Sequence, residues 1–331
     1  MKTQEIPVID ISPLVHSVAS ENDLQRVATE IRQACCDHGF FYIKGHGVSE
    51  QLQADLEAVS QSFFSLSEAD KMKIAMPLAG TAWRGYFPVG NELTSGKPDL
   101  KEGIYFGAEL EDDHPKVVSR THLHGKNLFH PNSEQMRNTV LSYMDAVTKV
   151  GHALLRGVAL SLGLTSDYFE KETTKDPFIL FRIFHYPGKA SIPQADWGVG
   201  EHTDYGLLTI LKQDNIGGLQ VKVQGKWIDA PPIPNTFVCN LGDMLDRMTG
   251  GLYRSTPHRV LNTSGKSRLS FPLFFDPGFD VHVKPIEGFA SVNDSVSERW
   301  DNENIYKFDG PYGEYLVNKV SKVFPELFRS V

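Results

Sequence analysis

The sequence predicts a mainly β core, of the sandwich or jelly-roll kind, flanked by helices and preceded by an α/β region. Three features support this fold class. After Pro177, short runs rich in β-branched and aromatic residues alternate with Gly and Pro. One long stretch of helical periodicity precedes them, and shorter strand-like and helical segments alternate before it. Many short strands separated by such turns are typical of sandwiches and jelly rolls.

The first fifty residues predict a strand, a helix and a second strand. Residues 8–11 form a short alternating run, and apolar residues recur at helical spacing between 24 and 35, up to His38-Gly39. Residues 40–43 are an apolar run that indicates a buried strand. Ser49 is placed to cap the next helix.

Between about residues 80 and 132 the pattern is irregular and rich in glycine. Such segments often serve as lids or binding loops. His122 and His124 within it could form a metal pair. Because no third ligand stands nearby in a recognisable pattern, we interpret them as histidines of a solvated loop.

Residues 132–162 form the longest helical stretch, which Gly163 can end. We expect a spine that packs against a sheet. Gly151 and Gly157 could kink this helix or allow close packing. Residues 312–324 predict a final helix that stops before Pro325.

The strand candidates after Pro177 are residues 178–186, 206–211, 219–223, 227–230, 236–240, 258–261 and 268–275. Gln224-Gly225 is a candidate hairpin turn between two of them. We expect residues 1–125 to form an N-terminal region with the irregular loop. Residues 126–331 would hold the spine helix, the β core and the final helix, all in one compact unit.

Composition narrows the class of protein. The chain has 331 residues, of which 40% are hydrophobic and 22% charged, as in ordinary soluble proteins. A net charge of −8 without a run of Lys and Arg disfavours nucleic-acid binding. No secretory signal and no stretch long enough to span a membrane is visible. No feature demands a protein partner.

Three cysteines, Cys35, Cys36 and Cys239, cannot form a disulfide framework. This favours a reducing, cytoplasmic setting. We interpret all three as small buried apolar side chains rather than catalytic groups.

The chemistry centres on residues 200–209. His202 and Asp204 are two positions apart, so in a strand their side chains would project from one face. With His258 as third ligand, two imidazoles and one carboxylate describe the triad of non-haem Fe(II) oxygenases. Three ligands and an open position would also serve catalytic zinc, so this pattern leaves the metal open.

Arg268 and Ser270 follow His258 and share one face of an expected strand. A guanidinium offers a planar fork of donors to two oxygens, and a neighbouring hydroxyl adds a third donor. The pair is therefore suited to a carboxylate.

In order and spacing, His202-Thr203-Asp204, His258 and Arg268-Leu269-Ser270 resemble the His-x-Asp…His…Arg-x-Ser signature of the iron(II)- and 2-oxoglutarate-dependent oxygenases, specifically the isopenicillin-N-synthase-like family. Between Asp204 and His258 lie 53 residues, a gap similar to that of the family.

The resemblance implies a double-stranded β-helix with the metal between its sheets. It implies that His202, Asp204 and His258 hold Fe(II), and that Arg268 and Ser270 take the distal carboxylate of 2-oxoglutarate. The implied reaction uses O2, oxidises a small molecule, usually by hydroxylation, and releases succinate and CO2. Ascorbate is expected to support it.

The segment Phe184-His185-Tyr186-Pro187 resembles the family's Asn-x-Tyr-Pro, whose tyrosine helps to bind the co-substrate. Phe184 stands where asparagine is usual, so we expect Arg182 or Tyr186 to compensate, since all three share a strand face. An equally favoured alternative is that Tyr186 does not bind the co-substrate and is an aromatic residue of the core whose hydroxyl has a hydrogen-bond partner. The Asn240-Leu241-Gly242-Asp243 segment resembles a family turn and is interpreted as architectural.

Several short segments look closer to members that hydroxylate arginine or homoarginine, and to the ethylene-forming enzyme, than to flavonoid or gibberellin oxygenases. In those relatives an acidic residue before the barrel and the tyrosine after the metal aspartate meet the guanidinium. The matching positions in this sequence are Glu102 and Tyr205. The alternative interpretation of Glu102 is a charged residue at the protein surface.

Other hypotheses remain at this stage. An Fe(II) oxidase of the same fold could work without 2-oxoglutarate. A non-catalytic barrel that only binds a ligand has no need of all five signature residues. A zinc hydrolase is a weaker alternative.

Overall fold

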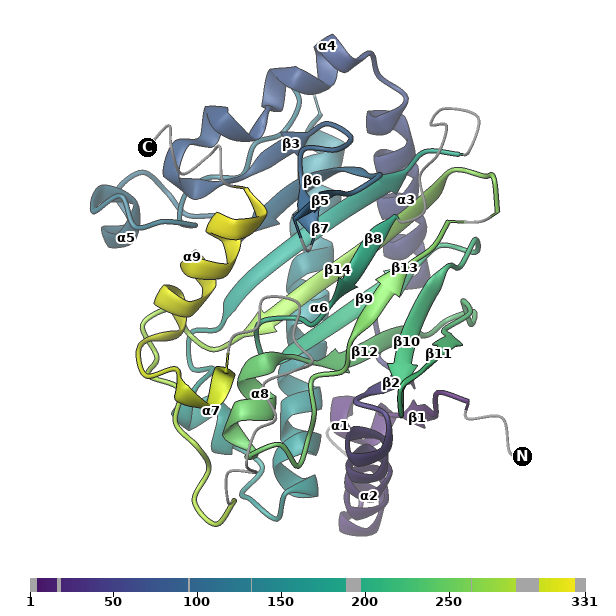
Figure 1. Cartoon of the computed structure of the whole chain (residues 1–331), viewed down its shortest axis with the longest axis vertical. Helices are drawn as coiled ribbons and strands as arrows, with labels where there is room; N and C mark the ends of the chain where they lie inside the picture. The colour runs from purple at the N-terminus through teal and green to yellow at the C-terminus, as the bar shows by residue number, and fades with distance from the viewer. Residues whose placement is uncertain are drawn as a thin grey trace.

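Two β-sheets form the centre of the computed structural model, which describes residues 5–16, 19–94, 96–131, 133–188, 198–262, 264–289 and 304–324. The larger sheet has the strand order β1-β2-β12-β9-β14-β7-β6-β3, and the smaller has β11-β10-β13-β8. In Figure 1 the smaller sheet lies over the larger one, with helices around them. This is the jelly-roll core that the strand-rich second half of the sequence predicts.

The strands of the larger sheet are β1 (Val8–Asp10), β2 (Phe40–Lys44), β3 (Gly85–Phe87), β6 (Glu102–Gly107), β7 (Phe178–Tyr186), β9 (Leu208–Gln213), β12 (Phe237–Leu241) and β14 (Arg268–Asp276). Those of the smaller sheet are β8 (Val199–His202), β10 (Leu219–Val223), β11 (Lys226–Asp229) and β13 (His258–Val260). A separate ribbon consists of β4 (Leu93–Thr94) and β5 (Lys97–Pro98). Apart from the parallel pair β1 and β2, the described strand pairs are antiparallel.

Helix α6 (Glu134–Ser161) is the predicted spine, and it packs against β14 and β9 of the larger sheet. Helices α2 (Glu21–Asp37) and α3 (Glu50–Phe64) pack beside it. A Cβ atom on Gly151 would lie 2.3 Å from the ring of Phe275, and one on Gly157 would lie 2.7 Å from Leu14 and Ile31 side chains. The two glycines therefore allow close packing of a continuous helix rather than a kink.

The remaining helices are short, except for α9. They are α1 (Ser12–Val15), α4 (Glu68–Lys71), α5 (Pro115–Val118), α7 (Tyr168–Glu172), α8 (Asp243–Met248), α9 (Tyr312–Val323) and the 3-10 helices η1 (Met72–Ile74), η2 (Met76–Ala82) and η5 (Ile305–Lys307). Ser49 caps α3 as predicted, because its hydroxyl accepts a hydrogen bond from the amide of Leu52. Helix α9 confirms the predicted final helix.

Two expectations from the sequence are wrong. The segment from residue 80 to 132 is not irregular throughout, since β3 and β6 extend the larger sheet beyond β7. Glycines at both ends of β6 obscure its strand pattern, although all six of its residues are buried. Cys36 is exposed on α2, whereas Cys35 and Cys239 are buried as expected.

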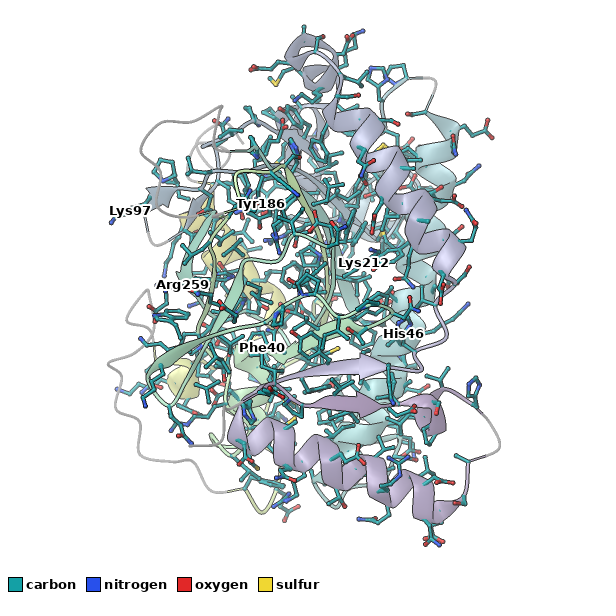
Figure 2. The ribbon with its side chains drawn as sticks, turned by 90° about the vertical axis from the view of Figure 1, so that its right-hand side faces the viewer. Phe40, His46, Lys97, Tyr186, Lys212 and Arg259 are labelled. Carbon is teal, nitrogen blue, oxygen red and sulfur yellow. The ribbon has the colours of Figure 1, made fainter. Side chains whose placement is uncertain are left out.

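Side chains sort clearly onto the faces of these sheets. In Figure 2, Phe40 and Tyr186 point into the interior, while Lys212 lies on the side of α3 and Arg259 on the side of the smaller sheet. Lys212 forms an ion pair with Glu57 of α3. Within the described ranges, no helix combines the length and the apolar composition that crossing a membrane requires.

Candidate active site

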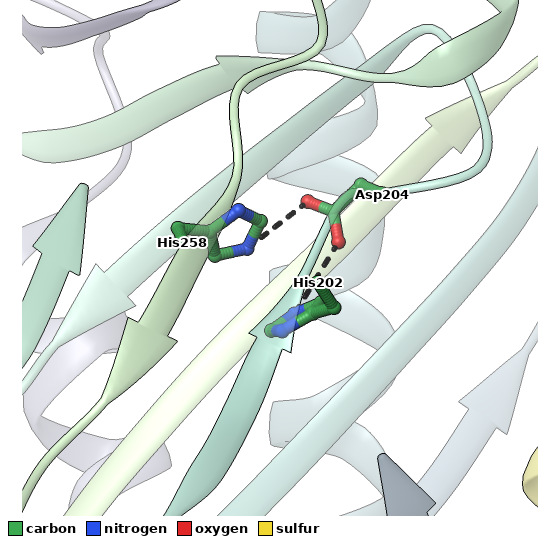
Figure 3. Close-up of side chains that lie close together, drawn as sticks. All are labelled: His202, Asp204 and His258. Atoms are coloured by element: carbon green, nitrogen blue, oxygen red, sulfur yellow. Dashed lines mark ion pairs between the residues drawn. The ribbon is translucent and has the colours of Figure 1, made fainter. Parts of the chain in front are cut away.

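His202, Asp204 and His258 lie together between the two sheets. His202 ends β8 and His258 begins β13, and the two residues stand opposite each other in paired strands. The Nε2 atom of His202 lies 3.9 Å from Oδ1 of Asp204, and Nε2 of His258 lies 3.8 Å from Oδ2 (Figure 3). Among the described residues, this is the one group of three or more His, Cys, Asp or Glu side chains that could hold a metal ion.

The geometry differs in one respect from the expected strand pair. Asp204 lies two residues beyond the end of β8, so the turn after the strand, rather than strand parity, aims its carboxylate. That turn is fixed from α8, since the amide of Asp243 donates to the carbonyl of Asp204 at 2.8 Å. A Cβ on Gly242 would lie 2.3 Å from the carbonyl oxygen of Gly206. Gly242 is therefore needed for this close approach.

Backbone carbonyls orient both imidazoles. Nδ1 of His202 lies 2.8 Å from the carbonyl of Gly200, and Nδ1 of His258 lies 3.2 Å from that of Thr256. If each Nδ1 carries the proton, each Nε2 presents its lone pair to the centre. Burial, together with nearby His258, lowers the pKa of His202 to about 3, which keeps its ring neutral.

Two further side chains hold the carboxylate. Oδ2 of Asp204 accepts hydrogen bonds from Asn240, at 2.7 Å, and from Thr209. Burial alone would raise the pKa of Asp204, but the two histidines and these hydrogen bonds outweigh it and lower the pKa. Asn240 therefore has more than the architectural role expected from its turn. Its place at the inward-facing end of a buried strand was the signal that could have identified it.

A cavity opens from this cluster between the sheets and encloses about 880 Å³ of atom-free space, including its mouth. Arg268, Ser270, Tyr186, Arg182 and Tyr205, all expected at the site, line it. The structure thus brings these five side chains and the His-Asp-His cluster into one space.

Arg268 is the strongest candidate for binding an anion. It is fully buried, and none of its three guanidinium nitrogens has a hydrogen-bond partner among the described residues. Its guanidinium carbon lies 4.7 Å from the centre of the Tyr186 ring, and Tyr186 stands opposite it in the paired strands β7 and β14. A buried cation without partners is costly, so a carboxylate ligand fits this position.

The sequence did not identify Glu92 and Lys101, which also line the cavity. Glu92 ends the loop before β4, and Lys101 directly precedes β6. The ammonium of Lys101 lies 4.7 Å from the ring centre of Phe184, the residue that stands where the resembled family has asparagine. Both residues lie in the glycine-rich segment, where the absence of a regular period hides which side chains point inward.

Glu102 requires a correction, because it does not line the cavity. It is buried, so it is not a surface charge either. Its carboxylate accepts hydrogen bonds from Lys71, at 2.7 Å, and from Tyr86, and lies 2.7 Å from Nδ1 of His185. Glu102 stands opposite His185 in the paired strands β6 and β7. Because side chains alternate between the two faces of a strand, His185 and Glu102 lie on the opposite face from Phe184 and Tyr186, which line the cavity.

His122 and His124 do not form a metal pair with any third ligand in the described part of the chain. Nδ1 of His124 lies 2.8 Å from the carbonyl of His122, and its ring packs against Phe178 and Phe279. His124 is therefore largely a packing residue.

The donor set fits an iron site with open positions. Two imidazole nitrogens and one carboxylate oxygen face a common point, which is the facial arrangement typical of non-haem Fe(II). The unpartnered guanidinium of Arg268 fits the distal carboxylate of 2-oxoglutarate in the same cavity.

Comparison with known proteins agrees with this geometry. The model of the 2OG-Fe(II) oxygenase superfamily matches residues 178–277, and that of the "non-haem dioxygenase in morphine synthesis N-terminal" region matches residues 6–132. A probable iron/ascorbate oxidoreductase of Dictyostelium discoideum is 53% identical over 99% of this chain and 97% of its own length.

Other relatives are also similar over nearly their whole length. A 1-aminocyclopropane-1-carboxylate oxidase of Dictyostelium discoideum is 41% identical over 98% of this chain and 96% of its own. A homoarginine-6-hydroxylase of Oryza sativa subsp. japonica is 39% identical over 95% and 96%. The crystal structure of a full-length Neurospora crassa protein in complex with alpha-KG has a TM-score of 0.78, with 28% identity and 96% of each chain covered. Family, relatives and fold agree: the chain belongs to the 2OG-Fe(II) oxygenase superfamily and is an iron(II)- and 2-oxoglutarate-dependent oxygenase that oxidises a small molecule.

Proposed function

We propose that this enzyme hydroxylates an amino acid with a cationic side chain, with arginine and homoarginine as the first candidates. One observation carries the proposal. Glu92 is buried at the cavity wall, and the ammonium of Lys101, 3.0 Å from its Oε2, is shared with Asp99, so the positive charge beside Glu92 is divided between two carboxylates. A buried carboxylate oxygen of this kind favours a ligand that brings its own N–H donors and positive charge.

The surroundings of Glu92 keep it charged. Burial alone would raise its pKa, but Lys101 and Arg182 lower it, so the group is ionised near neutral pH. Its other oxygen accepts a hydrogen bond from Tyr105 at 2.6 Å. Names of relatives such as homoarginine-6-hydroxylase support a guanidino substrate.

The remaining cavity residues receive roles that fit this reaction. Iron(II) held by His202, Asp204 and His258 would activate O2, which is the oxidant, and 2-oxoglutarate would supply two of the four electrons that O2 takes up while a C–H bond is oxidised. Arg268 and Ser270 hold the distal carboxylate of the co-substrate. Arg182, held over the rings of Tyr105 and Phe274 at 4.2 and 4.6 Å, adds positive charge beside the co-substrate. Apolar side chains such as Leu93 and Val323 exclude water.

The direct test is succinate formation from 2-oxoglutarate with Fe(II), ascorbate and O2, with arginine or homoarginine present. Citrulline, the neutral isostere of arginine, is the matched control. We expect succinate to rise with a cationic amino acid and much less with citrulline, and Glu92→Gln to lose this preference. Equal rates with arginine and citrulline would reject the proposed substrate class.

A second experiment tests the metal ligands. His202→Ala and Asp204→Ala should each abolish turnover and iron binding, while the protein keeps its circular dichroism spectrum. Iron-dependent turnover in both variants would be incompatible with the assigned triad.

A second candidate function is the oxidation of a small amino acid such as 1-aminocyclopropane-1-carboxylate, which the name of another relative favours. The same assay separates the two functions, because succinate that rises with this compound and not with arginine or homoarginine would support this candidate.

Three lesser points belong to the proposal. We infer ascorbate as the reductant that keeps the iron ferrous, in line with the relative named as an iron/ascorbate oxidoreductase. We also infer a cytoplasmic location from the three free cysteines. No nucleic acid or protein partner is required for this activity.

A further inference from the structure

Three charged side chains stand at the base of the β4–β5 ribbon. Glu92, Asp99 and Lys101 are exposed by only 4%, 2% and 1%. The backbone amide of Asp99 donates to the carbonyl of Glu92 at 2.9 Å, which closes the ribbon at its base. The three side chains are therefore held close together in a water-poor environment.

The ammonium of Lys101 lies between the two carboxylates. It donates a hydrogen bond to Oδ2 of Asp99 and forms an ion pair with Oε2 of Glu92 at 3.0 Å. Thr94 donates to the same oxygen of Asp99 at 2.7 Å and fixes that carboxylate. Asp99 thus competes with Glu92 for the positive charge of Lys101.

The two carboxylates, Glu92 and Asp99, differ in their position relative to the cavity. Glu92 and Lys101 line the cavity, whereas Asp99 does not. Two carboxylates share one ammonium, which leaves a net negative charge in the trio. Arg182 compensates it only in part, because its Nη1 lies 3.6 Å from the other oxygen of Glu92.

We propose that Asp99, a positioning residue outside the cavity, sets the preference of the enzyme for cationic substrates by competing with Glu92 for the ammonium of Lys101. The inference rests on the proposed function and extends it. With Asp99 present, Lys101 neutralises Glu92 only in part, so Glu92 still attracts the positive end of the substrate. Without the Asp99 carboxylate, Lys101 would pair with Glu92 alone and neutralise it.

The test compares kcat/KM for arginine with kcat/KM for citrulline, or for homoarginine and homocitrulline if these react faster. In Asp99→Asn the ratio should fall about tenfold or more, through a higher KM for the cationic member of the pair. The kcat with saturating substrate and the KM for 2-oxoglutarate should stay unchanged. Calorimetry of arginine binding without O2 should show the same loss of affinity.

Two variants make the result specific. Glu102→Gln alters another buried carboxylate paired with a lysine, Lys71, but outside the cavity, and should leave the ratio unchanged. Lys101→Met removes the competing cation and should raise the ratio, in the opposite direction to Asp99→Asn. Loss of structure cannot produce such opposite changes, and Lys101→Met alone decides the matter if Asp99→Asn does not fold.

The outcomes separate this inference from the function on which it rests. A wild-type enzyme with no preference for arginine over citrulline overturns both. A wild-type preference that Asp99→Asn leaves intact, or that falls in Lys101→Met, overturns only the role of Asp99.

Discussion

At the scale of single residues, Arg268 links the stability of the folded protein to the binding of a ligand. Its guanidinium is fully buried, with no hydrogen-bond partner among the described residues. An unpaired buried charge destabilises a fold by several kcal/mol, and a bound carboxylate offsets that cost. Arg268 is therefore expected to lower the stability of the ligand-free protein while it provides affinity for 2-oxoglutarate.

This leads to a prediction for Arg268→Met. The ligand-free variant should be more stable than the wild type by about 1–3 kcal/mol, because a buried unpaired charge is replaced by an apolar side chain of similar length. Its affinity for 2-oxoglutarate should fall about 100-fold, since charge-assisted hydrogen bonds contribute about 1.5–3 kcal/mol each. Thermal unfolding with and without 2-oxoglutarate measures both effects.

Arg259→Met is the matched control, because Arg259 lies 3.9 Å from the centre of the Trp227 ring, on the side of the smaller sheet. It should leave co-substrate affinity unchanged. Unaltered 2-oxoglutarate binding in Arg268→Met would remove Arg268 from the co-substrate site.

A second prediction concerns Asn240, whose amide holds Oδ2 of Asp204. In Asn240→Ala the carboxylate loses one of its two side-chain donors and becomes free to turn. Metal affinity should fall about 10- to 100-fold, as is usual for a lost partner of a metal ligand. Calorimetric titration of the protein with Fe(II) under anaerobic conditions measures this. Wild-type affinity would show that Thr209 alone is sufficient.

At the scale of elements, the accuracy of the sequence predictions followed the strength of each pattern. Strand β7 has the predicted limits, and α6, β14 and α9 end within two residues of theirs, because their apolar runs are long and regular. Strand β6 was missed because Gly103 and Gly107, near its two ends, leave only three apolar residues in a row. The metal ligands could be predicted because their order and spacing are unusual. Glu92 could not, since loop residues carry no period that tells which ones face a cavity.

The contact between α6 and β14 leads to a third prediction. Alanine at either Gly151 or Gly157 should gain about 1 kcal/mol from helix propensity. At Gly151 the new Cβ would meet the rigid ring of Phe275, whereas at Gly157 it would meet the methyl ends of flexible side chains. We expect Gly151→Ala to destabilise the protein by about 2–4 kcal/mol and Gly157→Ala to change stability by less than about 1 kcal/mol. Urea denaturation of both variants gives the comparison, and equal stabilities would contradict the packing argument.

At the scale of the whole molecule, the two sheets and the segments that close the cavity depend on each other. The N-terminal region contributes β6 beside β7, and the ribbon with Glu92 covers the cavity that β7, β8, β13 and β14 enclose. The C-terminal helix α9 adds Val323 to the lining, and its Tyr312 donates a hydrogen bond to Asp276 at the end of β14. Segments from both ends of the chain therefore complete one site.

Asp276 makes the stability of the folded protein depend on pH. Burial raises its pKa to about 7, while the hydroxyl of Tyr312 and the guanidinium of Arg182 lower it and the carboxylate of Asp204 raises it. The unfolded chain would bind this proton only below about pH 4. Between about pH 4 and 7 the folded state therefore holds more protons than the unfolded state, so this residue makes stability fall as pH rises.

The last prediction follows from that sign. Asp276→Asn removes the titrating group, so its free energy of unfolding relative to wild type should rise by about 2.5 kcal/mol between pH 5 and pH 8. Tyr312→Phe removes a donor that lowers the pKa, so it should extend the loss of stability to higher pH. Denaturation of the metal-free proteins across this range measures both. A difference in stability between Asp276→Asn and wild type that is constant with pH would show that Asp276 keeps an ordinary pKa. Burial where α9 meets β14 would then not keep this carboxyl protonated.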